Sequence, residues 1–202
     1  MLVLGSSSVA RRDLLVATGL TPTRVLAPNI DETQNPLESP TDYVRRIATE
    51  KANSLNTLPA EILITADTVV VNNREVLHKT SDQEIAKNYL KSLSGKRHKV
   101  FTAIAIKHQK KISCYLVKST LKMKLLSELE IDQYLRSKEW INKAGAYSIQ
   151  GKAMSFFVFI SGCVGYSSTG VLGTGVSIAM DPRTVGTQID DSLMQKNLRA
   201  KL

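Results

Sequence analysis

Apolar residues recur along this chain with two spacings, one typical of helices and the other typical of strands. Helical spacing predicts two helices near the start of the chain, over residues 9–18 and 41–56. Short or alternating apolar runs predict strands over residues 2–4, 23–27, 62–71, 99–107, 112–124 and 154–160. Because strand–helix–strand units occur together with an antiparallel pair, the pattern predicts a mixed α/β fold.

Capping signals predict two further helices. A serine followed three residues later by a glutamate forms a capping box, in which the two side chains satisfy free backbone N–H groups. Such boxes begin at Ser81 and at Ser127, and the helices they predict extend to about Leu93 and Ser137.

The strand predicted over residues 62–71 contains a single acid. Its sequence, ILITADTVVV, is rich in β-branched side chains and predicts a strand buried on both faces. Burial of an isolated charge is costly, so Asp67 has to be paired, metal-bound or hydrogen-bonded. Asp67 is therefore a candidate site residue; the alternative is a carboxylate at a strand end that caps a neighbouring loop.

Composition indicates an ordinary globular protein. The chain has 202 residues, 43% of them hydrophobic, which is enough to bury a core in one domain or in two closely apposed lobes. Its two cysteines, Cys114 and Cys163, form no CxxC pattern, which favours a reducing compartment. The N-terminus lacks a signal-peptide pattern and no apolar run approaches membrane-spanning length, so we expect a cytoplasmic protein that does not enter a membrane.

The net charge of +9 favours polyanionic partners. Part of the excess lies at Lys118, Lys122 and Lys124, which share strand parity and should face one side of a sheet. No aromatic residues alternate with these lysines, as a stacking platform for bases would need. A solvated sheet face is therefore favoured over a nucleic-acid groove, and we do not expect nucleic acid as a partner.

The loop before the first helix can bind an anion. Residues 5–8, with the sequence GSSS, offer hydroxyls and backbone N–H groups at a helix N-terminus, and Arg11 follows on the first turns. Ser8 is alternatively only the N-cap. We expect Leu14 and Leu15 to face inward from this helix.

Other charged residues have open interpretations. Lys51 lies on a mostly apolar helix beside Glu50, and it is either a ligand-binding cation or a lysine in a surface ion pair. The pair at residues 31–32, Asp-Glu, can bind a divalent cation or simply be solvated. We expect His78 and His98 to be surface or structural residues.

Taken in order, six segments of the chain resemble the Maf-like nucleoside triphosphate pyrophosphatase family. They are LGSSSVARRDLL, NIDET, YVRRIATEKA, ITADTVVVNNREVLHK, LSGKRHKVFTAIAI and NKAGAYSIQGKA. The resemblance covers about residues 2–162. It implies a two-lobed mixed α/β sheet with flanking helices and a central cleft, a homodimer, and a divalent metal cation, magnesium or manganese. The implied reaction hydrolyses nucleoside triphosphates to the monophosphate and pyrophosphate, in a nucleotide-pool sanitising role.

The same resemblance implies roles for individual residues. Asp67 is the implied catalytic residue, acting as general base directly or through the metal, and the implied metal ligands are Glu32 and Asp67. The implied substrate-binding residues are Ser6, Ser8, Arg11, Lys51, Thr68, Lys79 and Gln150. Within this set, Arg11, Lys51 and Lys79 supply cations for the phosphates, and Thr68 and Gln150 resemble the positions that read the base.

The chain departs from the family pattern at several positions. The first segment has Val9 where the family usually has proline and Ala10 where it has the first of two basic residues, and Lys79 is flanked by His78 and Thr80 instead of glycine and proline. The segments at residues 67–68 and 144–151 nevertheless resemble the dTTP/UTP branch rather than the 7-methyl-GTP branch. The preferred base therefore stays open.

The tail, residues 163–202, differs from the family segment at this position. It is rich in glycine and lacks helical spacing, whereas the family continues with an amphipathic helix. Either a frameshift near residue 162 or divergence within a lineage explains the difference. We expect residues 1–202 to form one domain, of which 163–202 is an atypical tail.

A different class of function is also compatible with this composition. The chain can be a nucleotide- or nucleic-acid-binding regulatory module linked to cell division that binds without turnover, and a nucleotidyltransferase would use similar metal chemistry. Two acids, Glu32 and Asp67, favour hydrolysis, because a pure phosphate binder needs cations and has little use for acids.

Overall fold

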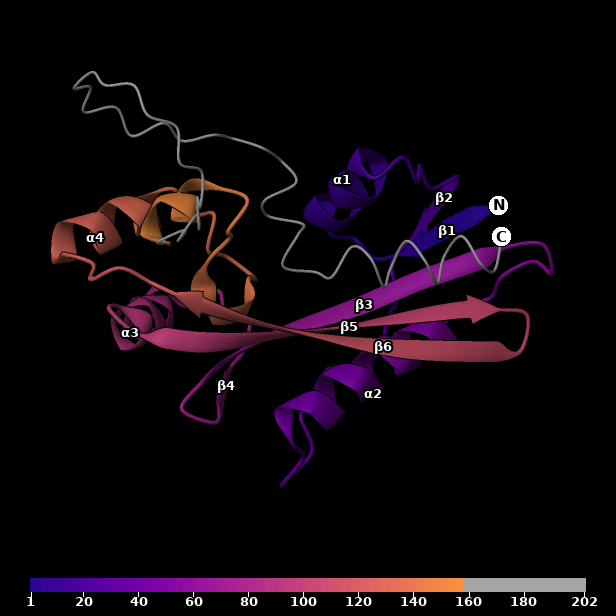
Figure 1. Cartoon of the computed structure of the whole chain (residues 1–202), viewed down its shortest axis with the longest axis horizontal. Coiled ribbons are helices and arrows are strands. Elements are labelled where there is room, and N and C mark those ends of the chain that lie inside the picture. The colour runs from indigo at the N-terminus through magenta and orange to yellow at the C-terminus, as the bar shows by residue number, and fades with distance from the viewer. Residues whose placement is uncertain (158–202) are drawn as a thin grey trace, which may run out of the picture. The chain divides into compact units, whose positions relative to one another are not determined.

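A single mixed sheet runs through the computed structural model, which describes residues 1–157 (Figure 1). Its strands are β1 (Leu2–Gly5), β2 (Arg24–Leu26), β3 (Ile62–Asn72), β4 (Glu75–Leu77), β5 (Arg97–His108) and β6 (Lys111–Lys122). The strand order is β2-β1-β3-β5-β6, and β4 pairs with β3 outside this path. Because β1 is parallel to β2 and β3 while the other pairs are antiparallel, the expectation of a mixed α/β sheet is confirmed.

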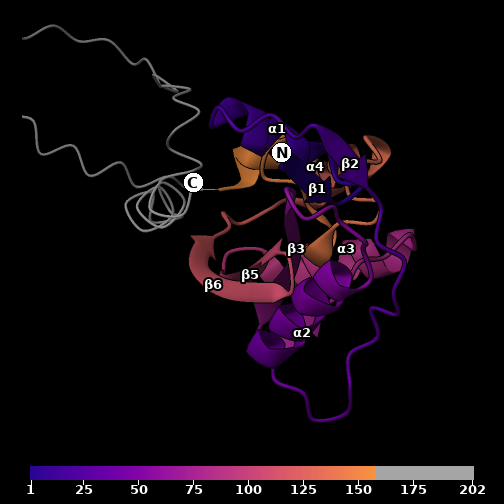
Figure 2. The same cartoon turned by 90° about the vertical axis from the view of Figure 1, so that its right-hand side faces the viewer.

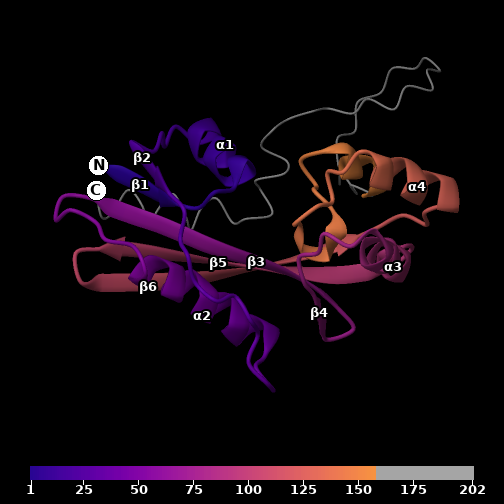
Figure 3. The same cartoon turned by 180° about the vertical axis from the view of Figure 1, so that it is seen from behind.

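The four predicted helices are all present. They are α1 (Val9–Ala17), α2 (Pro40–Asn53), α3 (Gln83–Leu93) and α4 (Glu128–Arg136), followed by the 3-10 helices η1 (Ala144–Ala146) and η2 (Lys152–Phe156). Figure 2 shows α1 and α2 on opposite sides of the sheet. Figure 3 shows α3 and α4 at the end of the long strands away from β1 and β2. No helix among the described residues is long and apolar enough to cross a membrane.

Two hydrophobic cores lie along the sheet and account for the two expected lobes. The first packs α2 against β3, β5 and β6, and it includes Ile47, Leu63 and Val71. The second packs α3, α4, η1 and η2 around the far ends of β3 and β5, and it includes Val70 and Leu90. Because successive side chains of a strand point to opposite faces, β3 contributes to both cores.

Helix N-termini agree with the capping signals except at one position. Ser127 forms the expected capping box with Glu130. The N-cap of α3 is Asp82 and not Ser81, so this prediction was wrong by one residue. The physical reason is that the Asp82 carboxylate accepts hydrogen bonds from two backbone N–H groups, those of Glu84 and Ile85.

The predicted strand over residues 154–160 is also wrong where it is described. Residues 152–156 form η2, and Phe157 makes only an isolated antiparallel bridge to Met123. The turn of η2 places both Phe156 and Phe157 in the second core, whereas a strand would point them to opposite faces. Residues 158–160 and the tail 163–202, with Cys163, lie outside the described residues, so the expectations about the tail and a single domain of residues 1–202 stay predictions.

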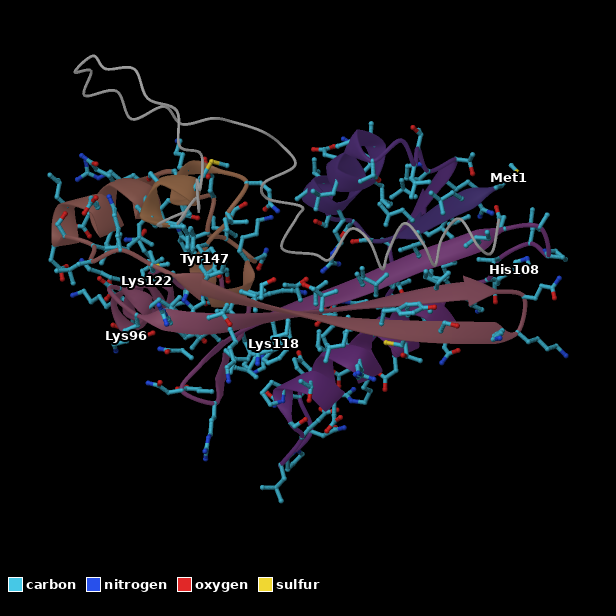
Figure 4. The ribbon with its side chains drawn as sticks, in the orientation of Figure 1. Met1, Lys96, His108, Lys118, Lys122 and Tyr147 are labelled. Carbon is cyan, nitrogen blue, oxygen red and sulfur yellow. The ribbon has the colours of Figure 1, made fainter. Side chains whose placement is uncertain are left out.

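Two expectations about side-chain direction need correction. Lys118 and Lys122 are exposed on β6 as expected (Figure 4), but Lys124 lies beyond the end of that strand and its Nζ pairs with Glu130 Oε1 at 2.6 Å. In α1, Leu14 is exposed and Leu15 is only half-buried. Within the described part of the chain, α1 buries none of its residues, because its described anchors are polar groups at its N-terminus.

Candidate functional site

The strand β3 has an unpaired stretch of edge in its middle. β5 pairs with one edge along residues 62–71. On the other edge, β1 pairs as far as Thr65 and β4 begins to pair at Val70, so residues 66–69 have no strand beside them among the described residues. A cavity of about 180 Å³ lies at this gap, lined by Glu32, Tyr43, Asp67, Thr68, Val69, Leu77, His78, Lys79 and Ala144. The expected cleft is therefore present, and it lies where the sheet is open.

Adjacent residues of β3 at this gap point their side chains to opposite faces of the sheet. Asp67 points toward α2, whose Lys51 it contacts, and Thr68 points toward α1, whose Arg11 it contacts. This alternation is a property of any strand. A ligand at the gap can therefore touch groups from both faces of the sheet.

Lys51 lies at the centre of the charged groups. It is buried on α2, and its Nζ lies 2.9 Å from Asp67 Oδ1 and 2.8 Å from Glu32 Oε1. The two carboxylate oxygens are therefore no more than 5.7 Å apart, the sum of 2.9 and 2.8 Å. Glu50, its sequence neighbour, pairs instead with Arg46, so the surface ion pair considered for Lys51 is not the one that forms.

Glu32 links the two lysines. Its Oε2 accepts a hydrogen bond from Lys79 Nζ at 2.6 Å, while Oε1 faces Lys51. Partial burial alone would raise the pKa of Glu32, but the hydrogen bonds from Lys51 and Lys79 outweigh it and hold that pKa below its usual value. Glu32 is therefore an anion at neutral pH, and cations and anions alternate along Lys79, Glu32, Lys51 and Asp67.

Tyr43, on α2, is a site residue that none of the sequence patterns assigned to the site. Its ring lies in the first core, and its hydroxyl donates a 2.6 Å hydrogen bond to the backbone carbonyl of Glu32, which fixes the loop that carries this acid. Burial, with the nearby charges of Asp67 and Glu32, raises the pKa of Tyr43 to about 12, so the hydroxyl keeps its proton. A tyrosine on an otherwise apolar helix face was the signal available, because a buried hydroxyl needs a partner.

Arg11 joins α1 to the open edge of β3. Its Nη1 donates to the carbonyl of Ala66 at 2.8 Å and to Ser6 Oγ at 3.2 Å, and its Nη2 donates to Thr68 Oγ1 at 3.4 Å. Burial lowers the pKa of Arg11, and the negative charges of Asp67 and Glu32 oppose that shift. An arginine stays protonated in proteins, so Arg11 is a fixed cation at the cavity.

The serine loop is folded onto itself beside this arginine. Ser8 is the N-cap of α1, where its Oγ accepts the backbone N–H of Arg11 at 3.4 Å. Its own backbone N–H donates to Ser6 Oγ at 3.2 Å. The capping role considered for Ser8 is therefore present, and the phosphate-binding roles of Ser6 and Ser8 stay predictions.

Gln150 is a predicted site residue that is not among the residues lining the cavity. It is exposed, and it makes no described hydrogen bond to the other site residues. Asp31 is also exposed, and its carboxylate accepts hydrogen bonds from Thr33. It does not line the cavity, so the structure gives no support to the metal-binding role considered for it. His78 lines the cavity and contacts the Tyr43 ring edge to face, with centroids 5.9 Å apart.

The acids at the cavity fit a small divalent cation that also binds phosphate. No cluster of three or more histidine, cysteine, aspartate or glutamate side chains that could hold a metal ion occurs within residues 1–157, so this part of the chain offers Glu32 and Asp67 as its two carboxylates at the cavity. Oδ2 of Asp67 accepts no hydrogen bond from the described residues, which leaves one oxygen available. Mg²⁺ commonly takes one or two carboxylates and completes its shell with water and substrate phosphates. The donor set therefore suits a divalent cation that completes its shell with water and phosphate oxygens.

The family model described as Maf-like protein matches residues 1–173. The chain belongs to this family. The match extends past residue 162, where we expected the resemblance to end, and stops within the tail. The Maf-like assignment made from the six sequence segments is thus confirmed.

Named relatives are similar over most of their length. A dTTP/UTP pyrophosphatase of Cereibacter sphaeroides is 43% identical over 172 residues, which cover 85% of this chain and 88% of the relative. A dTTP/UTP pyrophosphatase of Zymomonas mobilis is 44% identical over 163 residues, which cover 80% and 81%. Among solved structures, a HAM1 protein from Coxiella burnetii aligns with a TM-score of 0.44 and 13% identity, over 75% of this chain and 89% of that one.

Proposed function

We propose that this chain hydrolyses dTTP and UTP to the nucleoside monophosphate and pyrophosphate. The observation that carries the proposal is the alternation of Lys79, Glu32, Lys51 and Asp67 beside the cavity at the open edge of β3. The names of the Maf-like relatives, both dTTP/UTP pyrophosphatases, support the same reaction and substrates. A sanitising role in the nucleotide pool follows from this activity, and a homodimer stays a prediction.

The charges suit a triphosphate. Arg11, Lys51 and Lys79 supply three positive charges against the two negative charges of Glu32 and Asp67. A nucleoside triphosphate carries about four negative charges, which exceed this surplus of one, so a bound Mg²⁺ or Mn²⁺ would offset two of the about three that remain. Glu32 and Asp67 would hold that ion, which neutralises phosphate charge as the leaving group departs.

Asp67 is suited to accept the proton of the attacking water. In the proposed step, the water oxygen bonds to the α-phosphorus, the bond between that phosphorus and the oxygen bridging to the β-phosphorus breaks, and pyrophosphate leaves with that oxygen. When Glu32 is the carboxylate that holds the ion, the water proton passes to the available oxygen of Asp67, and Lys51 holds the other oxygen at 2.9 Å and so orients the carboxylate. Lys79 and Arg11 would bind phosphate oxygens as charge-assisted donors.

The products and an isotope label test the reaction. Purified protein with magnesium or manganese should release pyrophosphate, and no orthophosphate, from dTTP or UTP. In water enriched in oxygen-18, the label should enter the monophosphate, because the water attacks the α-phosphorus. Orthophosphate as first product, or label in the pyrophosphate, would contradict the proposed function.

Lys79 offers a test of phosphate binding. It is half exposed at the mouth of the cavity, so Lys79→Ala should remove a charge-assisted contact with little damage to the fold. Affinity for a non-hydrolysable α,β-methylene dTTP, measured by calorimetry, should fall roughly 10- to 150-fold, and affinity for thymidine should stay unchanged.

A matched control for this measurement is Lys118→Ala, which removes an exposed lysine on β6 outside the cavity lining. The control should bind both ligands as the wild type does. Equal losses for thymidine and for the triphosphate analogue in Lys79→Ala would mean that this lysine supports the fold and does not bind phosphate.

A further inference from the structure

Thr102 is a polar residue behind the cavity that none of the predicted roles uses. It lies on β5 directly opposite Thr68 of β3, and the two side-chain oxygens are 3.1 Å apart. Thr68 lines the cavity, whereas Thr102 is not among the lining residues. Thr102 is therefore placed to act on a ligand in this cavity through Thr68.

The hydrogen bonds around Thr68 restrict the direction of its hydroxyl hydrogen. A threonine hydroxyl has one hydrogen and two acceptor positions. Arg11 Nη2 donates to this oxygen at 3.4 Å, and an arginine has no acceptor, so Thr68 can only accept from it. In the 3.1 Å contact with Thr102, Thr68 is either the donor or the acceptor. If it is the acceptor, its own hydrogen stays available for a ligand in the cavity.

Only one of the two arrangements can use both hydroxyl hydrogens, and it does so when a ligand accepts a hydrogen bond from Thr68. If Thr68 donated to Thr102, the hydrogen of the half-buried Thr102 would have no acceptor side chain among the described residues. If Thr102 donates, its hydrogen is used, both acceptor positions of Thr68 are filled, and the hydrogen of Thr68 is left for an acceptor on a ligand in the cavity that Thr68 lines. Polar groups that are removed from water favour the arrangement in which each donor has a partner.

We infer that Thr102 is a specificity-determining positioning residue, which makes the Thr68 hydroxyl a hydrogen-bond donor toward the base. The inference rests on the proposed function and on the role that the family resemblance implies for Thr68, which is to read the base of the nucleotide. A fixed donor favours a base that presents a carbonyl oxygen at this position and disfavours one that presents an amino group. Thymine and uracil carry a carbonyl oxygen where cytosine carries an amino group, so the pair selects dTTP and UTP over dCTP.

Two substitutions at the same position separate the hydroxyl from the shape of the side chain. Thr102→Val keeps the branched shape and removes the hydroxyl, and Thr102→Ser keeps the hydroxyl and removes the methyl group. The measured quantity is the ratio of the affinities for α,β-methylene dTTP and α,β-methylene dCTP, with melting temperature as the check on folding. We expect the ratio to fall roughly tenfold in Thr102→Val and to stay at the wild-type value in Thr102→Ser.

A merely structural threonine pair would give a different result. Cross-strand threonine pairs stabilise sheets slightly, so Thr102→Val would then lower the melting temperature and leave the affinity ratio unchanged, which overturns the inference. Thr68→Val should lower the ratio as much as Thr102→Val, and the double variant should lower it no further, because both act through one hydroxyl. Independent, additive effects would also overturn it.

Binding is the readout because it does not need turnover. If the protein releases no pyrophosphate but the affinity ratio responds as expected, the hydrolysis proposal fails and the role of Thr102 stands. If pyrophosphate is released and the ratio in Thr102→Val equals that of the wild type, the reaction stands and the role of Thr102 fails. A wild type that binds the two analogues equally also overturns the inference, since there is then no preference to set.

Discussion

Replacing Asp67 by Asn should lower the turnover of dTTP roughly 10²- to 10⁴-fold while nucleotide binding survives. Asparagine has nearly the same shape but cannot accept a proton or carry the charge that Lys51 contacts at 2.9 Å. Pyrophosphate release measures the turnover, and calorimetry with α,β-methylene dTTP measures the binding.

A suitable control is Asp13→Asn, which removes an exposed carboxylate on α1 that contacts Arg12. Its turnover should match that of the wild type. If Asp67→Asn keeps wild-type turnover, Asp67 has no part in the reaction. If the substitution abolishes nucleotide binding instead, the role of this acid is in holding the substrate and not in proton transfer.

Acid should destabilise the protein through His98. This histidine is 3% exposed in the second lobe, its Nε2 lies 2.9 Å from the hydroxyl of Tyr147 (labelled in Figure 4), and its Nδ1 has no partner in the described structure. Burial lowers the pKa of His98 from 6.5 to about 4, because a charged ring would lose its hydration there. The folded protein therefore binds this proton less readily than the unfolded chain does.

The sign of the effect follows from proton linkage. Above pH 6.5 the ring is neutral in the folded and the unfolded state, so its titration does not change the free energy of unfolding. Between pH 6.5 and about 4 only the unfolded chain takes up the proton, so the free energy of unfolding should decrease by about 3 kcal/mol over this range, at about 1.4 kcal/mol per pH unit.

Urea unfolding at several pH values measures this slope. Comparison with His98→Gln separates the contribution of His98 from that of the carboxylates, which titrate in the same pH range. Glutamine has no titrating group and can still bond to Tyr147, so the variant should be less stable at pH 7 but should lose stability less steeply toward pH 4.5. Parallel curves for the two proteins would show that His98 does not titrate in this range.

The fold could be predicted from the sequence where one segment carries its own pattern. The strand β3 and the helices α2 and α4 each have an apolar period or a capping box within their own residues, and they form close to the expected ranges. Residues 152–156 were predicted incorrectly because their apolar run fits a strand and a short buried helix equally well. Only packing in the second core distinguishes the two.

The candidate site was predictable in its members but not in its contacts. The buried acid at Asp67 stood out because an apolar strand does not tolerate an unpaired charge. The sequence did not show that Lys51 pairs with Asp67, because that contact depends on how α2 packs against β3. Thr102 was missed because its role depends on strand register, which places it opposite Thr68, and the threonine itself is an ordinary strand residue.

The gap in β3 has a consequence for solubility. Unpaired backbone groups at a sheet edge are a template on which a strand of another molecule can add, and long open edges promote aggregation. Here the opening is limited to residues 66–69, and Arg11 already occupies the carbonyl of Ala66. The charged side chains of Lys79 and Glu32 line the same opening, and charge at an edge discourages strand addition. The groups proposed to bind the nucleotide thus also protect the chain from pairing with its own copies.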